Sequence, residues 1–192
     1  MDENMKVLVT GGAASGKSEY AEKVLLSLAG SGEKLYIACM RNDSEAAKKR
    51  IARHRALREG KGFVTIEKDT GLGDLTERVR GTSLLIEGAG MLLSNEMFSP
   101  NPAGAPENFS PAAGGQGLSV KTAVERTVSG ISTLLQAADQ AVLVTDEIFS
   151  DGRDYDELTM AYIRALGEVN RRLAALCDRR VEVVYSYPVE IF

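Results

Sequence analysis

One short stretch constrains the fold of this chain more than any other, namely residues 7–23, VLVTGGAASGKSEYAEK. An apolar run leads into a glycine-rich turn, which is followed by Lys-Ser and a segment of helical composition. Residues 11–18, GGAASGKS, match the pattern G-x-x-x-x-G-K-[ST] in full. The glycines allow backbone turns that side chains would block, so successive N–H groups can point at phosphate oxygens near the positive end of a helix. The stretch therefore predicts a nucleotide phosphate site between a strand and a helix.

The parts of this loop have separate expected roles. Lys17 would reach the β- and γ-phosphates of a nucleoside triphosphate, and Ser18 would offer its hydroxyl to Mg²⁺. We therefore expect Mg²⁺ as the cofactor and ATP or GTP as substrates. The nucleotide-binding residues expected in the loop are Gly11, Gly12, Ala13, Ala14, Ser15, Gly16, Lys17 and Ser18.

A phosphate loop of this kind also needs an acidic residue near the metal, usually at the end of a neighbouring buried strand. Two places qualify. Glu87 ends the run LLIE, and Asp146 and Glu147 follow the run VLVT. Each acid could hold Mg²⁺ directly or through water, or could merely cap the next loop. We assign Glu87 a catalytic role and a metal-binding role beside Ser18, and leave the roles of Asp146 and Glu147 open.

The rest of the chain alternates between strand and helix patterns. Hydrophobic residues make up 44% of the 192 residues and tryptophan is absent, which predicts an aliphatic core. Nearly continuous β-branched runs predict strands at 6–11, 34–38, 83–88, 141–146 and 181–186, with a weaker one at 63–67. Helices are expected at 17–29, 43–59, 120–137 and 154–178.

This alternation predicts a three-layer α/β fold, a P-loop NTPase fold of the RecA-like kind, with a mostly parallel sheet and helices on both faces. We expect residues 1–192 to form a single nucleotide-binding domain. Residues 99–117 break the pattern, because they hold four of the five prolines and four glycines. Such a composition cannot bury enough apolar surface to become ordered, so we expect a disordered insertion there.

Charge, cysteine content and hydropathy exclude several classes of protein. The net charge of −4 is unlike that of a duplex nucleic-acid binder. Cys39 and Cys177 show neither a metal-site spacing nor a disulfide framework, so we expect reduced thiols in the core. The N-terminus lacks a signal pattern, and no apolar run approaches the roughly 20 residues that a membrane helix needs. We expect a soluble, cytoplasmic protein without a membrane span.

The only histidine of the chain, His54, lies in the basic run KKRIARHRALREGKG. On a helix, Arg50, His54 and Arg58 fall at i, i+4 and i+8 and share one face. Two guanidinium groups beside an imidazole disfavour its protonation, which keeps it neutral and nucleophilic, and they also bind polyphosphate. Such a histidine could attack the α-phosphorus of a nucleoside triphosphate and expel pyrophosphate. The alternative is a solvated basic helix with an idle histidine.

Taken together, these pieces resemble the adenosylcobinamide kinase / adenosylcobinamide-phosphate guanylyltransferase family of cobalamin biosynthesis. The family's N-terminal ILVTGGxxSGKS is present as VLVTGGAASGKS, and its second strand YIAT as YIAC at 36–39. Its RIxxHxxxR is present as Arg50-Ile51 with His54 and Arg58. Further pieces are Phe63, Thr65 and Glu67 for an aromatic-x-Thr-x-Glu pattern, Glu87 and Asn95 for a strand-end acid with a later Asn, and Gly167, Asn170, Leu173 and Ala174 in the last helix.

The resemblance covers most of the chain outside 99–119, and it implies two reactions at one site. A nucleoside triphosphate would first donate its γ-phosphate to the aminopropanol hydroxyl of adenosylcobinamide. GTP would then guanylylate that phosphate through a GMP–histidine intermediate, for which His54 is in the matching position. The resemblance thus implies His54 as a catalytic residue, a corrinoid as the small-molecule partner, and a homotrimer. From the residue patterns we further expect Lys17 and Glu87 to be catalytic and Arg50 and Arg58 to bind the nucleotide.

Some positions depart from the family pattern. The family usually carries NEVGxGxxP after its fifth strand, where this chain has DEIFSDGRD, with Asp146 for Asn and Phe149 for Gly. Gly88 and Gly90 replace the Cys and Thr that follow the strand-end acid, and Ala46-Ala47 replaces Glu-Met. These changes cluster at strand ends and loops, where α/β proteins bind ligands.

Two other functions remain open from the sequence. The chain could be a P-loop small-molecule kinase without guanylyltransferase activity, in which His54 only binds phosphate. It could also be a nucleotide-binding regulatory protein with a degenerate acceptor site, because the loop after the strand at 141–146 is altered. A guanine-nucleotide switch of the usual kind is disfavoured, since no [NT]-K-x-D follows a strand.

Overall fold

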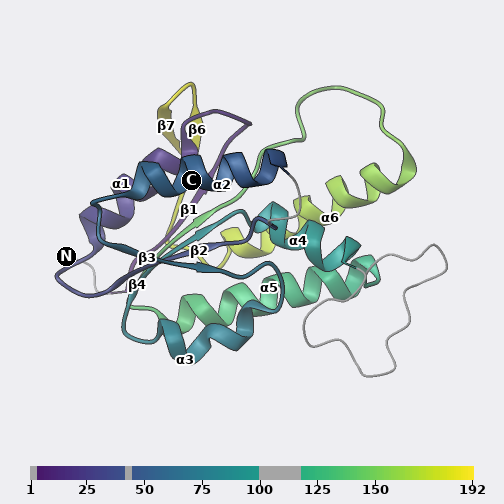
Figure 1. Cartoon of the computed structure of the whole chain (residues 1–192). Coiled ribbons are helices and arrows are strands. Elements are labelled where there is room, and N and C mark those ends of the chain that lie inside the picture. Colours follow the sequence, from purple (N-terminus) through teal and green to yellow (C-terminus); the bar gives the residue numbers. More distant parts are fainter. Residues whose placement is uncertain (1–3, 42–44, 100–117) are drawn as a thin grey trace.

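The structure is a computed structural model and describes residues 4–41, 45–99 and 118–192. Its helices and strands follow one another in an alternating order (Figure 1). In chain order they are β1 (Lys6–Thr10), α1 (Lys17–Leu28), β2 (Lys34–Ala38), α2 (Glu45–Arg58), β3 (Phe63–Glu67), the 3-10 helix η1 (Leu72–Leu75), α3 (Thr76–Val79), β4 (Ser83–Glu87), α4 (Ala89–Phe98), α5 (Val120–Ala137), β5 (Gln140–Val144), α6 (Glu157–Ala174), β6 (Arg179–Val184) and β7 (Tyr187–Glu190).

The strands form one seven-stranded sheet in the order β3-β2-β4-β5-β1-β6-β7. Every neighbouring pair from β3 to β6 is parallel, and β6 and β7 form an antiparallel hairpin at the edge. The three-layer α/β fold and the mostly parallel sheet predicted from the sequence are therefore confirmed, and so are the six predicted strands. The hairpin strand β7 was not predicted.

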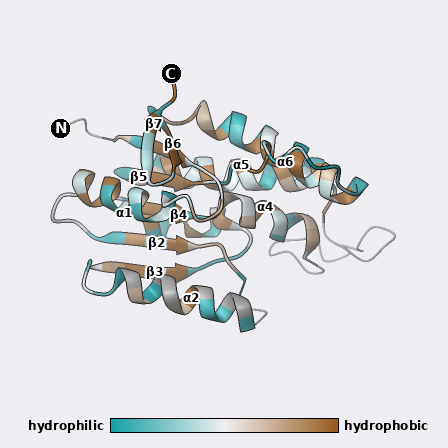
Figure 2. Ribbon diagram, turned by 90° about the horizontal axis from the view of Figure 1, so that it is seen from above, coloured by the Kyte–Doolittle hydropathy of each residue, from teal (hydrophilic) through white to brown (hydrophobic). Residues whose placement is uncertain are grey.

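The helices cover both faces of the sheet (Figures 1 and 2). Helix α1 packs on one face, where Val7, Val9 and Leu85 belong to a cluster with Val24 and Leu25. The other face packs against α3, α4, α5 and α6 in a larger and mainly aliphatic cluster. Because central strands are buried on both faces, they read as continuous apolar runs in the sequence and appear brown in Figure 2.

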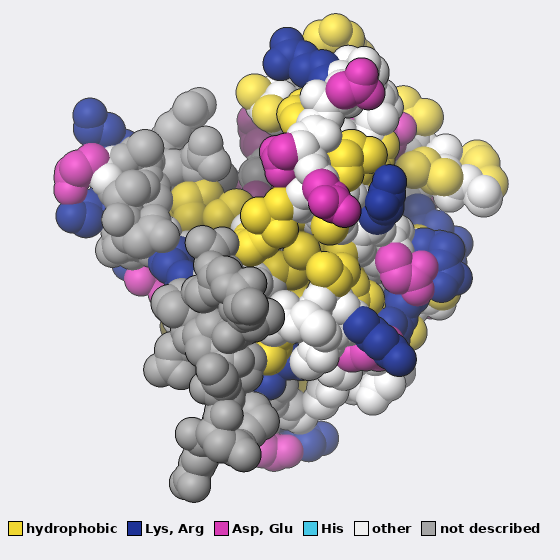
Figure 3. Space-filling view, turned by 90° about the vertical axis from the view of Figure 1, so that its right-hand side faces the viewer, with side chains coloured by type: hydrophobic (Ala, Val, Ile, Leu, Met, Phe, Trp, Pro, Cys, Tyr) yellow, Lys and Arg dark blue, Asp and Glu magenta, His cyan; other side chains and the backbone are white. Residues whose placement is uncertain are grey.

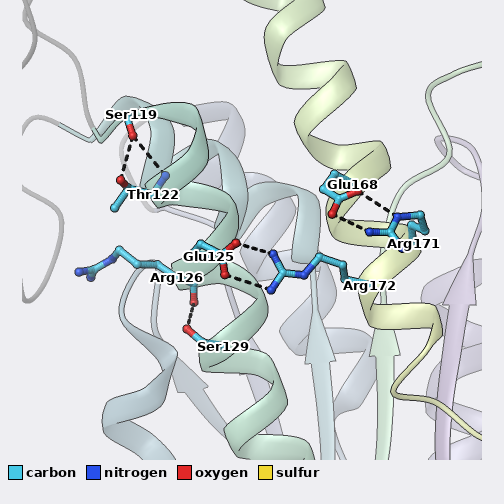
Figure 4. A network of polar contacts seen from close by, with 8 residues as sticks. All are labelled: Ser119, Thr122, Glu125, Arg126, Ser129, Glu168, Arg171 and Arg172. Carbon is cyan, nitrogen blue, oxygen red and sulfur yellow. Dashed lines mark hydrogen bonds and ion pairs between the residues drawn. The ribbon is translucent and has the colours of Figure 1, made fainter.

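The two long helices of the second face, α5 and α6, also contact each other through charged side chains (Figure 4). Arg172 on α6 donates to both carboxylate oxygens of Glu125 on α5, at 2.8 and 3.0 Å. Helix α6 begins after Asp156, whose carboxylate accepts from the backbone N–H groups of Leu158 and Thr159 at 3.0 Å. This cap explains why the helix starts later than the predicted residue 154.

Helices α3 and α4 and the turn η1 were not predicted. Helix α4, AGMLLSNEMF, directly follows β4 after Gly88, which has a φ of 94°. Its mostly apolar sequence continues the apolar run of β4, so no change of period marks the boundary between strand and helix. The predicted disordered insertion lies, apart from Ser99, outside the described residues, as do residues 43 and 44 of the second predicted helix.

Two smaller expectations concern thiols and the membrane. Cys39 and Cys177 are both free and buried, as predicted. None of the helices within the ranges 4–41, 45–99 and 118–192 is both long and apolar enough to cross a membrane.

Candidate active site

The glycine-rich loop lies between the carboxyl end of β1 and the start of α1. Gly11 is required by close approach, because a Cβ there would lie 2.6 Å from Ser15 Oγ and from the Val183 carbonyl oxygen. Gly16 adopts a φ of 90°, and a Cβ there would lie 2.7 Å from Ser186 Oγ. The turn of the β6–β7 hairpin supports the loop from outside, since the Ser186 N–H donates to the Ser15 carbonyl at 2.7 Å. The backbone of the loop thus adopts a shape in which two positions, Gly11 and Gly16, have to be glycine.

The first turn of α1 has free backbone donors. Among the described residues no side chain caps this helix, whose N-cap is Gly16. The first N–H groups of a helix have no partner within the helix, and they carry its positive dipole end. Together with the bent loop before it, this helix start has the backbone donors that an anion site needs, and the predicted binding of phosphate there stays a prediction.

Ser18 and Glu87 contact each other directly. The Ser18 hydroxyl donates to Glu87 Oε1 at 2.7 Å, although the two residues are far apart in the sequence. The contact is possible because Glu87 ends β4, near the end of β1 from which the loop emerges. The second carboxylate oxygen, Glu87 Oε2, is buried and has no hydrogen-bond partner in the described part of the chain. An unpaired buried carboxylate oxygen is costly, so this atom suits a ligand.

The surroundings of Glu87 disfavour its charged form. Burial raises the pKa of Glu87 above its ordinary value, and this rise is opposed by the hydrogen bond from Ser18 and by the charge of Lys17. The nearby Asp146 carboxylate raises the pKa further. A cation bound at this carboxylate would reverse the effect of burial.

Lys17 lies between the loop and a second acid. Its ammonium donates to the Gly12 carbonyl at 3.0 Å and lies 3.0 Å from Asp146 Oδ1. Glu147, the neighbour of Asp146, turns away and caps its own loop, because its Oε1 accepts from the Phe149 N–H and from Ser150 Oγ. Of the two acids that the sequence left open, only Asp146 therefore contacts the phosphate loop with its side chain, while Glu147 reaches it through its backbone N–H, which donates to the Gly11 carbonyl at 3.0 Å.

Arg58 reaches the same region from the end of α2. Only 6% of this residue is exposed, and its guanidinium carbon lies 3.5 Å from the centroid of the Tyr36 ring. The Nε and Nη1 atoms of Arg58 are buried without a hydrogen-bond partner in the described ranges. Tyr36 in turn lies beside Glu87, and burial, followed by the Glu87 charge, raises the pKa of its phenol far above the ordinary value. A line of contacts thus runs from Ser18 through Glu87 and Tyr36 to Arg58.

The structure addresses only part of the prediction made for His54. His54 and Arg50 lie within α2, so the predicted helix is confirmed. Their side chains lie outside the residues that the structure describes. The predicted roles of His54 and Arg50 therefore stay predictions.

Three polar residues shape the site without having been assigned a role in it. Asn95 Nδ2 donates to the carbonyls of Cys39 and Asp69, at 2.9 and 3.0 Å, and so joins the loops after β2 and β3 to α4. Asn170 on α6 donates to the Asp146 carbonyl at 3.1 Å. Tyr162, also on α6, donates to the Gly90 carbonyl at 3.1 Å. For Asn170 the sequence offered one signal of such a role, namely a polar residue within or beside the apolar stripe of the last helix.

The described residues contain no group of three or more His, Cys, Asp or Glu side chains that could hold a metal ion by themselves. This does not conflict with the predicted Mg²⁺ site at Ser18 and Glu87. Mg²⁺ in nucleotide enzymes usually binds through one or two protein oxygens together with phosphates and water. The pair formed by the Ser18 hydroxyl and the partly unpaired Glu87 carboxylate fits that donor set.

The raised pKa of Glu87 predicts a pH effect on stability in metal-free buffer with a chelator. Native Glu87 keeps its proton to a higher pH than the unfolded chain does, so the free energy of unfolding falls as pH rises above about 4.3, the ordinary pKa of a glutamate. Glu87→Gln removes this loss while its side-chain oxygen can still accept from Ser18. The stability of Glu87→Gln relative to the wild type should therefore increase between acid and neutral pH, as measured by urea unfolding.

The matched control is Glu77→Gln. Glu77 is exposed, and the hydrogen bond from Arg80 lowers its pKa, so removing its charge should not stabilise the protein as pH rises. If the free energy of unfolding changed with pH in the same way in the wild type and in Glu87→Gln, the assignment of a raised pKa to Glu87 would be contradicted.

Comparisons with known proteins identify relatives of the whole chain. The sequence model of the family described as cobinamide kinase / cobinamide phosphate guanyltransferase matches residues 7–191. The bifunctional adenosylcobalamin biosynthesis protein CobU of Salmonella typhimurium (strain LT2) is 29% identical over 194 residues, which cover 97% of this chain and 99% of that protein. The protein of the same name from Escherichia coli (strain K12) is 28% identical over 189 residues, with the same coverage. The chain therefore belongs to the cobinamide kinase / cobinamide phosphate guanyltransferase family.

Proposed function

We propose that this chain is a bifunctional enzyme of cobalamin biosynthesis. It phosphorylates adenosylcobinamide with ATP or GTP, and it then transfers GMP from GTP to give adenosylcobinamide-GDP. The observation that carries this proposal is the pair of contacts at the loop, Ser18 to Glu87 and Lys17 to Asp146, in a chain that matches the family over residues 7–191.

The kinase step uses the loop directly. The backbone N–H groups of the loop and Lys17 bind the phosphates, and the Lys17 charge stabilises the negative charge that develops on the β,γ-bridging oxygen. Ser18 and Glu87 would hold Mg²⁺, Glu87 directly or through water. Bound there, Mg²⁺ would neutralise phosphate charge and orient the β- and γ-phosphates. The unpaired Glu87 Oε2 supports this role.

The guanylyl transfer step uses α2. A ring nitrogen of His54 attacks the α-phosphorus of GTP, an N–P bond forms, the bond from the α-phosphorus to the bridging oxygen breaks, and pyrophosphate leaves. The phosphate of the phosphorylated acceptor then displaces the histidine. His54 lies one helical turn before Arg58, and Arg58 packs on Tyr36 beside Glu87, which supports a position of this helix near the nucleotide. The unpaired Arg58 nitrogens suit a phosphate group.

The acceptor would be a large and partly apolar corrinoid. Figure 3 shows hydrophobic side chains gathered on the side of the molecule that lies at the right of Figure 1. Exposed apolar side chains on the segment that follows β5 include Phe149 and Leu158, which are 45% and 55% exposed. This segment also carries Asp146, which contacts Lys17 of the phosphate loop. The homotrimer that the resemblance implies stays a prediction.

The first experiment tests the covalent intermediate. Wild-type protein incubated with Mg²⁺ and α-labelled GTP should take up label through an acid-labile, base-stable bond, and mass mapping should place the label on His54. His54→Ala should take up none, because the chain has no other histidine. The matched control is Lys48→Ala, an exposed residue on the same helix that pairs only with Glu45 in the described part of the chain, and it should label normally.

The same labelling, together with an assay of γ-phosphate transfer, separates this mechanism from the two alternatives, a kinase without guanylyltransferase activity and a regulatory protein. Retained label in His54→Ala would contradict the histidine mechanism. If γ-phosphate transfer to adenosylcobinamide occurred in the wild type without any GMP labelling, the chain would be a kinase only. Absence of both activities with a corrinoid acceptor would favour a nucleotide-binding regulatory protein.

The second experiment tests the phosphate and metal contacts. Lys17→Ala should bind Mg²⁺-triphosphate about 10- to 100-fold more weakly, because a charged hydrogen bond contributes about 1.5–3 kcal/mol. Ser18→Ala should lose the part of nucleotide affinity that depends on Mg²⁺. The measurement is calorimetric titration with and without Mg²⁺. Lys23→Ala, at an exposed position on the same helix, is the control, and equal affinities for Lys17→Ala and Lys23→Ala would rule out the assigned role of Lys17.

A further inference from the structure

The turn of the β6–β7 hairpin lies against the phosphate loop. Val184 pairs with Tyr187 across the hairpin, so Tyr185 and Ser186 form a two-residue turn between the strands. The Ser186 N–H donates to the Ser15 carbonyl at 2.7 Å. The peptide group that makes this hydrogen bond joins Ser186 to Tyr185. Tyr185 is therefore attached directly to the contact between the turn and the loop.

The backbone of this turn has a conformation that tyrosine rarely adopts. The φ angle is 49° at Tyr185 and 67° at Ser186. A two-residue hairpin turn with positive φ at both positions is usually built from Asn and Gly. A bulky side chain at positive φ is uncommon, and such residues cluster at binding and active sites. The turn itself therefore gives no reason for a tyrosine at residue 185.

The core gives no reason for this tyrosine either. Tyr185 is 88% exposed, so its ring gains almost nothing from burial in the folded chain. An aromatic ring carries a large apolar face that is stabilised when another flat group covers it. Tyr185 thus presents an uncovered aromatic face beside the phosphate loop.

The strand order places this ring on the nucleoside side of the loop. Lys17 and Ser18 contact the acids that follow β5 and end β4, and these two strands lie on one side of β1. In the proposed kinase step, this side receives the γ-phosphate and Mg²⁺. Strand β6 lies on the other side of β1, and Figure 2 shows β6 and β7 at the opposite end of the sheet from β2 and β3. A triphosphate with its γ end toward β4 and β5 therefore directs its nucleoside toward the hairpin turn.

We propose that Tyr185 is a stacking platform for the purine base of the nucleoside triphosphate that binds at the phosphate loop. The inference rests on the proposed kinase activity, because it uses the orientation of the triphosphate in that step. Stacking requires only the π face that every base has, so one tyrosine serves ATP and GTP alike. The ring adds affinity for the nucleoside and makes no contact with the phosphates.

Two other roles for Tyr185 make different predictions. If the residue only shaped the turn that supports Ser15, its replacement would weaken the binding of every phosphate chain, with or without a nucleoside. If its ring were covered by a second copy of the chain, its replacement would change the oligomeric state and leave nucleotide affinity unchanged. A stacking platform affects nucleosides alone.

The experiment measures the Kd for Mg²⁺-GTP, Mg²⁺-ATP and Mg²⁺-tripolyphosphate by calorimetric titration in the wild type, Tyr185→Gly and Tyr185→Phe. Glycine suits a φ of 49°, so Tyr185→Gly removes the ring and keeps the turn. Its Kd for both nucleotides should rise about fivefold or more, while its Kd for tripolyphosphate stays at the wild-type value. Tyr185→Phe keeps the aromatic face and should bind all three ligands like the wild type.

The matched control is Tyr187→Thr, which removes a second exposed tyrosine from the same hairpin. Tyr187 is 76% exposed. Val183 packs in the cluster on the α1 side of the sheet, so Val184 and its cross-strand partner Tyr187 point to the opposite side. Tyr187→Thr should therefore keep the wild-type affinity for all three ligands.

A direct readout of stacking comes from Tyr185→Trp. The chain has no tryptophan, so the fluorescence of this variant reports on residue 185 alone. Mg²⁺-GTP should quench the emission, because the base covers the indole ring. Mg²⁺-tripolyphosphate should leave the emission unchanged.

Each outcome decides between the roles. A loss of affinity in Tyr185→Gly for both nucleotides but not for tripolyphosphate, together with quenching by Mg²⁺-GTP in Tyr185→Trp, supports the platform. An equal loss for nucleotides and tripolyphosphate overturns it in favour of a role in the turn. Unchanged nucleotide affinity in Tyr185→Gly also overturns it, and a changed mass in size-exclusion chromatography would then assign the ring to a contact between copies. Absence of nucleotide binding in the wild type would instead be a failure of the proposed function.

Discussion

Two contacts made by adjacent residues hold the site together. Ser18 donates to Glu87 and Lys17 pairs with Asp146, so one turn of α1 is joined to the ends of two strands. The contacts depend on the strand order, because β5 lies next to β1 and β4 lies next to β5. Parallel strands present their carboxyl ends at the same edge, and the right-handed crossovers of such a fold return the chain there after each helix. The fold thus brings together residues that lie about 70 and 130 positions apart in the sequence.

The same contacts leave the empty site with polar groups that lack partners. Glu87 Oε2 and the Arg58 nitrogens Nε and Nη1 are buried without hydrogen bonds among the described residues. Each such group lowers the stability of the native state, and a bound ligand relieves that cost. The positions of these groups mark one region, which runs from the start of α1 across Tyr36 to the end of α2. The chemistry assigned to the loop and the chemistry assigned to α2 therefore use the same bound nucleotide in this account.

Much of this arrangement could be predicted from the sequence, and the reasons are local. The pattern GGAASGKS predicts its own backbone shape, and the buried runs around Leu8, Leu85 and Val142 predict a doubly covered sheet. What could not be predicted depends on contacts between distant segments. The Glu147 side chain is held away from the phosphate loop by its contacts with Phe149 and Ser150. The position of Arg58 over the Tyr36 ring depends on a contact between the end of α2 and β2. Helix α4 was missed because its residues are as apolar as those of the strand before it.

In the proposed mechanism one triphosphate site serves both reactions. It is tested most directly by inhibition with a GTP analogue in which methylene groups replace both bridging oxygens of the phosphate chain, so that neither bond can be cleaved. The inhibition constant is measured for γ-phosphate transfer from GTP to adenosylcobinamide and for GMP labelling of His54. A shared site predicts the same inhibition constant for both reactions. An analogue that inhibits one reaction and leaves the other untouched would contradict it.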